Sequence, residues 1–256
     1  MTTVDLNADC GESFGPWNMG DDPAILSIVT SANVACGFHA GDPDTMLETF
    51  ATAKERGVSV GAHPGYEDLT GFGRRIIPMK PEAIETMVAY QIGAAVAMSA
   101  MAGHPISHVK AHGALSNHAM VDPDAANAVA AAVKAVDPNL TLLAIATTEL
   151  ERAGREAGLK VASEIFADRA YEANGLLMSR AKPGSVLSDG DDAASRIVAM
   201  VKEGAIIAHD GTRIPTAIHS ICVHGDNPHA IAIASTVRTA LEGAGVTLAP
   251  FASNGH

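Results

Sequence analysis

Residues 30–63 read TSANVACGFHAGDPDTMLETFATAKERGVSVGAH. The run Thr30–Cys36 predicts a buried strand, and Asp42–Arg56 predicts a helix with an aspartate N-cap and a proline in its first turn. Gly57 follows the last apolar turn, where helices commonly end on a left-handed residue, and Val58–His63 predicts the next strand. A strand, a helix and a second strand in this order predict two parallel strands connected by a helix.

The same alternation of short strands and longer helices continues along the chain. Further strands are expected at Val4–Ala8, His108–His112, Leu140–Ile145, Val161–Phe166, Ile218–Val223 and Val246–Leu248. Further helices are expected at Pro81–Ala102, Asp122–Val136 and Asp189–Glu203. A length of 256 residues suits one α/β barrel, so we expect a single catalytic domain over residues 1–256. Periodicity alone leaves a doubly wound sheet as an alternative.

Charge and cysteine content narrow the class of protein. The formal net charge is −12, and such a field repels the phosphates of nucleic acids and anionic lipids, so we expect neither nucleic acid nor membrane as a partner. The three cysteines, Cys10, Cys36 and Cys222, are widely spaced, which is typical of reduced thiols. The N-terminus shows no leader pattern, and the apolar stretch Met87–Ala102 is too short and too interrupted for a bilayer span. A cytoplasmic location is expected.

Polar residues gather at the carboxyl ends of six predicted strands, where parallel α/β folds place their functional sites. The segments are DLNADCGE (5–12), NVACGFHAGD (33–42), GAHPG (61–65), HVKAHGALSN (108–117), EIFADR (164–169) and ICVHGD (221–226). Alternate residues of a strand share one face, so three strands each aim several polar groups in one direction: Asp5, Asn7 and Asp9; His108, Lys110 and His112; Cys222 and His224.

A single histidine on a strand is as often a satisfied core residue as a functional one. Several coincident polar strand ends, in contrast, need mutual hydrogen bonds or a ligand. Five histidines lie at or soon after strand ends, with carboxylates near them in sequence: His39, His63, His112, His209 and His224, and Asp9, Glu12, Asp42 and Asp226. Imidazole and carboxylate together supply general acid–base catalysis or a divalent-metal site. The first candidates for metal ligands are Asp9, His39 and His63.

Several common motifs are missing from the sequence. It contains no phosphate-binding loop of the GxxxxGK[ST] type, no nucleophile elbow and no dinucleotide fingerprint. The segment GFGRR, residues 71–75, resembles a grip for a phosphate or carboxylate, because two flexible glycines precede two arginine forks. The alternative is a surface turn whose arginines form ion pairs.

Taken together, the motifs resemble those of the LamB/YcsF family. The matching segments are DLNADCGESFG, TSANVACGFHAGDP, GAHPGYEDLTGFGRR, HVKAHGALSN, FADRAY and ICVHGD, in this order over nearly the whole chain. Each segment alone is a weak signal, but chance similarity of six segments in order is implausible. The chain departs from the family pattern where Ala111 replaces a proline and Ser116 replaces a tyrosine, which puts the shape of that loop in doubt.

The resemblance implies an irregular (β/α) barrel of about seven parallel strands, related to glycoside hydrolases and deacetylases. It also implies a reaction, the opening of the lactam of 5-oxo-L-proline to give L-glutamate while ATP is cleaved to ADP and phosphate, in a complex with partner subunits B and C. The ATP requirement that the resemblance implies is interpreted as activation of the amide oxygen, and since no phosphate-binding loop is present here, we expect the nucleotide step to depend on the partner subunits.

Hydrolysis of a lactam requires an activated carbonyl, a water nucleophile and a proton for the leaving nitrogen. For acid–base catalysis we expect His63, His112 and His224, oriented by Asp9 and Asp226, and for the developing oxyanion Lys110. For substrate binding we expect Asn7, His39, Arg74 and Arg169. The alternatives are a metal-dependent deacetylase or amide hydrolase acting on a carbohydrate derivative, and a subunit that only binds a small molecule.

Overall fold

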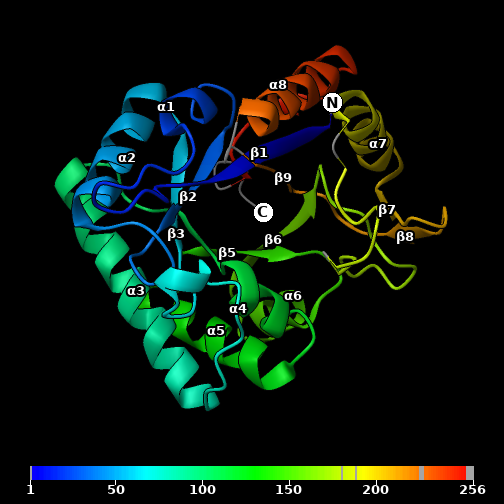
Figure 1. Cartoon of the computed structure of the whole chain (residues 1–256). Helices are drawn as coiled ribbons and strands as arrows, with labels where there is room; N and C mark the ends of the chain where they lie inside the picture. The colour runs from blue at the N-terminus through cyan, green and yellow to red at the C-terminus, as the bar shows by residue number, and fades with distance from the viewer. Residues whose placement is uncertain (1, 180, 188, 225–227, 252–256) are drawn as a thin grey trace.

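Parallel strands form a closed barrel at the centre of the structure (Figure 1). The structure is a computed structural model and describes residues 2–179, 181–187, 189–224 and 228–251. Around the barrel the strands follow the order β1-β2-β3-β4-β5-β6-β9, and parallel pairing between β9 and β1 closes it. Their bounds are Thr3–Cys10, Ser31–Ala35, Ser59–His63, His108–Lys110, Thr141–Ile145, Lys160–Phe166 and Ser220–Val223. The closure excludes the doubly wound sheet and confirms an irregular barrel of seven parallel strands.

Helices form the layer around the barrel (Figure 1). They are α1 (Asp22–Ile25), α2 (Pro43–Arg56), α3 (Pro81–Ala102), α4 (Gly113–Ala119), α5 (Pro123–Val136), α6 (Glu149–Glu156), α7 (Gly190–Glu203), α8 (Pro228–Gly243) and the 3-10 helix η1 (Leu69–Gly71). The side chains of Asp42 and Asp122 cap α2 and α5, as predicted. The predicted strand His108–His112 ends two residues early, because His112 occupies the N-cap position of α4.

Three strands lie outside the barrel. The predicted strand near the C-terminus, β10 (Thr247–Leu248), pairs with the start of β1. A hairpin of β7 (Ala205–Ile207) and β8 (Arg213–Pro215) was not predicted, because its strands are only three residues long. His209 lies in the turn of this hairpin, where Nδ1 is 3.9 Å from Glu172, so it is not part of the histidine group at the barrel end.

Helix α3 is the one helix in the described ranges that is long and apolar enough to cross a membrane, judged by length and composition. Its inner face is buried, with Ile84, Val88 and Ile92 at most 1 % exposed. This face packs in the outer layer between α2 and α5. The position is that of a helix buried on one side against its neighbours.

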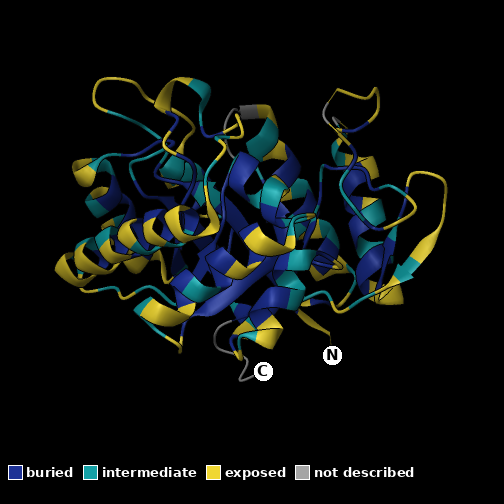
Figure 2. Ribbon diagram, turned by 90° about the horizontal axis from the view of Figure 1, so that it is seen from below, coloured by how far each residue is buried: buried dark blue, intermediate teal, exposed yellow. Residues whose placement is uncertain are grey.

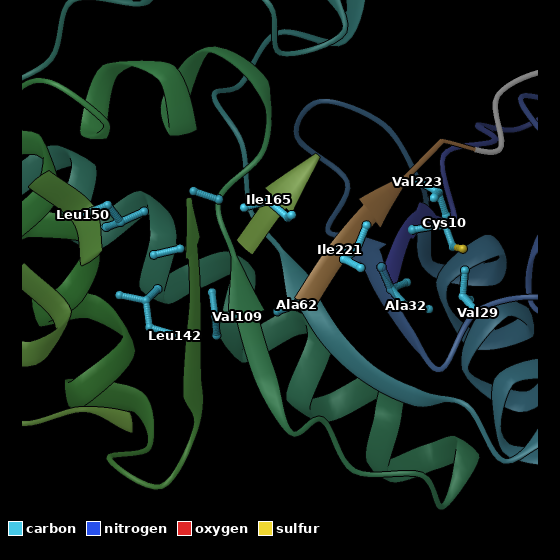
Figure 3. Close-up of a cluster of buried hydrophobic side chains, with 14 of the residues drawn as sticks. Cys10, Val29, Ala32, Ala62, Val109, Leu142, Leu150, Ile165, Ile221 and Val223 are labelled. Atoms are coloured by element: carbon cyan, nitrogen blue, oxygen red, sulfur yellow. The ribbon is translucent and has the colours of Figure 1, made fainter. Parts of the chain in front are cut away.

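The main apolar core lies between the barrel and the helices. Figure 3 shows Ala62, Val109 and Ile221 of this core on β3, β4 and β9. In Figure 2 buried residues fill the middle of the molecule, and exposed residues lie on the outer helices and the loops. Because strand side chains alternate, the remaining strand positions face the barrel interior, and there the chain places buried polar residues such as Asn7 and Lys110. The functional site is built on this polar interior.

Asp5 lies at the amino end of the polar interior and is fully buried. Its carboxylate accepts hydrogen bonds of 2.6 Å from Thr30 Oγ1 and from Ser31 Oγ, and another from Ser220 Oγ. Burial raises the pKa of Asp5 to about 6, although these hydrogen bonds oppose the shift. The folded protein therefore holds a proton on Asp5 that the unfolded chain releases at lower pH.

The wild-type protein should lose stability as the pH rises from about 4 to about 6, and we expect the Asp5→Asn variant not to show this loss. In this window native Asp5, with a pKa of about 6, is protonated, whereas the unfolded carboxyl group ionises near 3.8. The folded state binds more protons there, so its stability falls as the pH rises. The free energy of unfolding of the variant, relative to that of the wild type, should therefore rise by at most about 3 kcal/mol between pH 4 and pH 7. Denaturant unfolding at both pH values measures this, and an identical pH dependence in the two proteins would contradict it.

Candidate active site

Lys110 is the centre of the polar network in the barrel. Its Nζ lies 2.9 Å from Glu164 Oε1 and 3.2 Å from Asp9 Oδ1. Asn7 Oδ1 and Cys222 Sγ are each 3.2 Å away. Burial alone would lower the pKa of Lys110, but the surrounding acidic groups, Asp9 first, hold the pKa well above its ordinary value. Lys110 is therefore charged, and its three N–H donors already have acceptors.

Asp9 is held from several sides. Asn33 Nδ2 donates to Asp9 Oδ1 at 3.0 Å and to Asn7 Oδ1 at 2.8 Å, and Asn33 Oδ1 lies 3.0 Å from His108 Nε2. Burial would raise the pKa of Asp9, yet its interactions with the neighbouring His63 and with the Lys110 cation keep the pKa well below the ordinary range. Asp9 is therefore an ionised carboxylate in a fixed position at the end of β1.

Three histidines pack ring against ring beside Asp9. The rings of His39 and His112 stack with centroids 3.7 Å apart, and the ring of His63 meets them edge-on at 5.5 Å and 5.0 Å. All three are at most 5 % exposed. Burial, and then the neighbouring histidines, hold the pKa of His39 well below its ordinary value, and burial lowers the pKa of His112 to about 3. His39 and His112 are therefore neutral at physiological pH and carry free lone pairs.

His63 has an orientation that favours a cation beside it. Its Nδ1 lies 2.7 Å from the carbonyl oxygen of Lys110, and since a carbonyl oxygen only accepts, Nδ1 carries the hydrogen. In neutral His63 the lone pair of Nε2 then faces Asp9 Oδ2 at 3.3 Å. Two electron-rich atoms in this arrangement need a proton or a metal ion between or beside them. A hydrogen bond from the second ring nitrogen to a backbone carbonyl is also usual for metal-binding histidine.

The cluster offers a set of ligands for a divalent metal. Glu12, His39, His63 and His112 each contribute one ligand atom, and these atoms lie within 4.8 Å of one another. Both ring nitrogens of His39, Nε2 of His63 and Nδ1 of His112 are buried without a hydrogen-bond partner. Unpaired buried polar atoms are costly, so an ion bound here would satisfy them. Nitrogen and carboxylate ligands in this number suit Zn²⁺ or a similar ion. Of the three expected ligands, the cluster contains His39 and His63; Glu12 and His112 join them in place of Asp9, which lies beside His63.

Glycines allow the backbone to approach the stacked pair His39 and His112. A Cβ atom on Gly73 would lie 2.6 Å from His39 Cβ and 2.7 Å from His112 Nδ1, and Gly73 has a positive φ of 62°. A Cβ atom on Gly65 would lie 2.7 Å from His39 Nδ1. The close approach to the two imidazoles explains why glycine stands at position 65 of the segment GAHPG and at position 73 of the segment GFGRR, since no larger residue fits there.

We expect Gly73→Ala to lower turnover at least tenfold, because the added methyl group displaces His39 or His112, and misplacement of catalytic groups by about 1 Å is costly. Gly57→Ala is the matched control. Gly57 also has a positive φ, of 68°, but a Cβ atom there meets nothing within 4 Å. Both variants should lose about 1 kcal/mol of stability from the strained backbone, with a further loss in Gly73→Ala from the clash with the two histidines, and only Gly73→Ala should lose activity. Equal turnover of the two variants would show that the glycine has no role at the site.

A second acid–base pair lies on the other side of the polar network. His224 Nδ1 is 2.7 Å from Asp168 Oδ2, and both side chains are mainly buried. Burial would lower the pKa of His224, but the hydrogen bond and charge of Asp168 raise it above the ordinary value. His224 therefore tends to be protonated where His39 and His112 are neutral. Groups whose pKa values diverge in this way are suited to opposite roles as acid and base.

The arginines of GFGRR take different positions. The guanidinium carbon of Arg74 lies 5.2 Å from the centre of the Phe72 ring, and that ring contacts His39 and His112 edge-on. Arg74 therefore stands near the histidine cluster and is exposed, so it is available to an anionic substrate. Arg75 binds Asp68 instead, which is the ion-paired turn that was the alternative for this segment.

Other expected substrate-binding residues have structural partners. The guanidinium of Arg169 donates to the carbonyl oxygens of Met178 and Ser185, so it holds the loop between β6 and α7 rather than the cluster. Asn7 is fully buried below Lys110 and donates to Glu164 and Ser220. Asp226 lies outside the described residues. The sequence does not distinguish an arginine or an amide side chain at a strand end that binds substrate from one that binds the protein's own backbone or side chains.

The structure brings together Asp9, His39, His63, Lys110 and His112, together with Glu12 and His108 from the polar strand ends noted in the sequence. It adds three residues not singled out in advance: Asn33, Glu164 and Asp168, which also lie within the six polar strand ends. The alternation of side chains placed His108 on the same face as Lys110, and it could also have identified Asn33 as inward-facing. The sequence could not show that His224 pairs with Asp168, because this contact depends on the paths of two loops that are far apart in the chain.

A closed parallel barrel with a histidine–carboxylate cluster and an opposing His–Asp pair at its carboxyl end defines an α/β-barrel hydrolase. The LamB/YcsF family model matches residues 4–256, and the chain belongs to this family. It is 58% identical over 246 residues to the A subunit of 5-oxoprolinase from Gluconobacter oxydans, covering 96% of this chain and 97% of the relative. It is 56% identical over 250 residues to the protein of the same name from Rhodopseudomonas palustris, covering 97% and 98%.

Solved structures agree with this assignment. A lactam utilization protein from Thermus thermophilus matches with a TM-score of 0.92 and 47% identity, covering 97% of this chain and 99% of the other. The catalytic domain of a peptidoglycan N-acetylglucosamine deacetylase from Eubacterium rectale matches with a TM-score of 0.52 and 10% identity, covering 97% and 88%. The second likeness shows the shared barrel fold, which confirms the expected relation to deacetylases at the level of fold.

Proposed function

We propose that the chain is the lactam-opening catalytic subunit of an ATP-dependent 5-oxoprolinase, which converts 5-oxo-L-proline to L-glutamate in the cytoplasm together with subunits B and C. The observation that carries the proposal is the 58% identity over 96% of the chain to a relative named as the A subunit of 5-oxoprolinase. The site supports it, since it combines neutral imidazoles, an ionised carboxylate and a histidine with a raised pKa at one barrel end. The whole described chain serves as one catalytic domain.

The histidine cluster supplies the nucleophile in this proposal. In the absence of an ion, neutral His39 and His112, with pKa values below the ordinary range, can accept a proton from water. A divalent ion held by Glu12, His39, His63 and His112 would occupy these lone pairs and would instead lower the pKa of a water molecule at the site. Asp9 orients His63, and Lys110 fixes Asp9.

Lys110 acts through Asp9 rather than on the lactam oxygen. Its three N–H groups are directed to Asp9, Glu164 and Asn7 within 3.2 Å, so none is left for an oxyanion. The expected role of Lys110 as an oxyanion donor is therefore replaced by a positioning role. Activation of the carbonyl falls to ATP, which the chain handles with its partner subunits because it has no phosphate-binding loop.

His224 protonates the leaving nitrogen. Asp168 holds its imidazole at 2.7 Å and raises its pKa against the effect of burial, which favours the protonated form that an acid catalyst needs. Arg74 binds the substrate carboxylate, because its guanidinium lies over Phe72 next to the histidines. The base and the acid thus come from separate groups on either side of the buried network.

A side-by-side substrate assay tests the proposal. The purified chain is incubated with N-acetylated oligosaccharides, with and without Zn²⁺ or Mg²⁺, and in parallel with 5-oxoproline, ATP and subunits B and C. The proposal expects glutamate in the second reaction and no acetate in the first. Release of acetate by the isolated chain without ATP would favour the metal-dependent deacetylase. Substrate binding without any effect of His39 or His224 substitutions on turnover would favour a subunit that only binds.

A further inference from the structure

A glutamine from the outer helix layer contacts the backbone beside the histidine cluster. Gln91 lies on α3 (Figure 1) and is fully buried, next to apolar residues of the same helix such as Val88 and Ile92. Its Oε1 accepts a hydrogen bond of 3.0 Å from Gly65 N, and its Nε2 donates to Gly65 O at 2.8 Å and to Met87 O at 3.1 Å. The oxygen and both hydrogens of the amide therefore have partners.

This amide is an unusual side chain for the buried face of α3. Removal of an amide from water costs free energy, and its hydrogen bonds offset that cost only in part. Two of the three hydrogen bonds join Gln91 to the N–H and the carbonyl of one residue, Gly65, in the segment between β3 and η1. Gly65 is buried as well, and without a Cβ atom its peptide groups rotate with little steric hindrance. Gln91 therefore fixes a backbone position that is intrinsically mobile.

Gly65 lies against the stacked histidine pair on its other side. A Cβ atom on Gly65 would lie 2.7 Å from His39 Nδ1 and 3.3 Å from His112 Nδ1. The preceding residue, Pro64, accepts a hydrogen bond of 2.8 Å from His112 N. The short segment of Pro64 and Gly65 is thus held by α3 on one side and lies beside both imidazoles on the other. A shift of this segment would displace the two rings.

We propose that Gln91 is a positioning residue for His39 and His112, which it holds in place through the backbone of Gly65. This inference rests on the proposed function, in which the histidine cluster supplies the nucleophile. The Nδ1 atoms of both histidines are buried without a hydrogen-bond partner. If Gln91 did not accept from Gly65 N, that N–H could turn to one of these nitrogens and occupy the lone pair that the reaction needs. Gln91 therefore fixes the rings and keeps their nitrogens available.

The first test compares two variants of α3 in the assembled enzyme. Gln91→Met keeps the length of the side chain and removes both contacts to Gly65. We expect its kcat to fall about tenfold or more, because misplacement of catalytic groups by about 1 Å is costly. The KM should change by less than about threefold, because Gln91 acts on the histidines and not on the substrate.

Ser99→Ala is the matched control. Ser99 is also buried on α3, at 2% exposed, and its Oγ donates to Val96 O of the same helix at 3.0 Å. This variant should lower the Tm by about 2–4 °C for the lost hydrogen bond and leave kcat unchanged. Loss of a buried hydrogen bond from α3 is then separated from loss of the contact to Gly65.

Gln91→Glu is a rescue variant that depends on pH. Its carboxyl group, when protonated, can accept from Gly65 N and donate to Gly65 O as glutamine does, but when ionised it has no hydrogen to donate. Burial raises the pKa of such a carboxyl group. The kcat of the variant relative to wild type should therefore be close to one at low pH and fall as the pH rises. A ratio of one over the whole pH range would contradict a need for the donor to Gly65.

A readout on the isolated chain separates this inference from the proposed reaction. The imidazole proton resonances of His39 and His112, assigned by their loss in His39→Leu and His112→Leu, should shift in Gln91→Met and stay unchanged in Ser99→Ala. Unchanged resonances with wild-type kcat in folded Gln91→Met would overturn the inference and make Gln91 a structural residue. Shifted resonances, in a chain that forms no glutamate with ATP and subunits B and C, would support the positioning role and refute the proposed reaction. If Gln91→Met does not fold, Gln91→Glu at low and high pH provides both readouts.

Discussion

Lys110→Met is expected to lower the free energy of unfolding by about 3–5 kcal/mol, because it leaves Asp9 and Glu164 as buried carboxylates without their shared cation. Turnover in the assembled enzyme should also fall, since Asp9 loses the group that fixes it next to His63. Thermal and denaturant unfolding measure the first effect, and glutamate release measures the second.

A double variant separates the charge effect from the loss of packing. In Lys110→Met with Glu164→Gln, one of the two buried negative charges is removed together with the cation, so part of the lost stability should return. Glu164→Gln alone keeps Lys110 paired with Asp9 and should cost less than Lys110→Met. If Lys110→Met were as stable as wild type, the ion network in the barrel would not be what holds Asp9 in place.

His39→Leu is expected to reduce turnover by roughly 10²–10⁴-fold, the range for a positioned acid–base group. In the metal-free protein the stability of the variant should hold or rise, because both ring nitrogens of His39 are then buried without partners and leucine removes them. The content of divalent metal after purification in its presence should fall as well. Steady-state turnover, thermal unfolding and elemental analysis give the three readouts.

His104→Leu is the matched control. His104 Nε2 lies 2.7 Å from the carbonyl oxygen of Val58 at the amino end of β3, away from the cluster. This substitution should cost about 1 kcal/mol of stability for the lost hydrogen bond and leave turnover unchanged. A His39→Leu variant that keeps its activity and loses stability like the control would make His39 a core residue.

Local signals were enough to predict most of the fold. All eight predicted strands are present. Several of them, such as β2 and β3, are apolar runs next to a capping aspartate or a helix-ending glycine, here Asp42 and Gly57. Closure of the barrel was not predictable from periodicity, because it depends on pairing between β1 and β9 across the length of the chain. The β7–β8 hairpin was missed because short antiparallel strands leave little pattern.

The candidate site was predictable in location and less so in detail. Strand alternation placed Asp9, Lys110 and His112 at one barrel end, where the structure has them. The contacts of long side chains depend on loops whose paths the sequence does not state. Arg169 therefore binds backbone carbonyls, and Glu12 joins the histidines from beyond the end of β1. In both cases the residue type was visible and its partner was not.

The central claim is that this barrel opens the 5-oxoproline ring only as part of an ATP-using complex. The most direct measurement follows glutamate and ADP in a reconstituted mixture of the chain, subunits B and C, ATP and 5-oxoproline, with each component omitted in turn. The account predicts one glutamate for each ADP in the full mixture and no glutamate when this chain, ATP or a partner is left out. Glutamate formed at the full rate without this chain, or formed by the isolated chain without ATP, would contradict it.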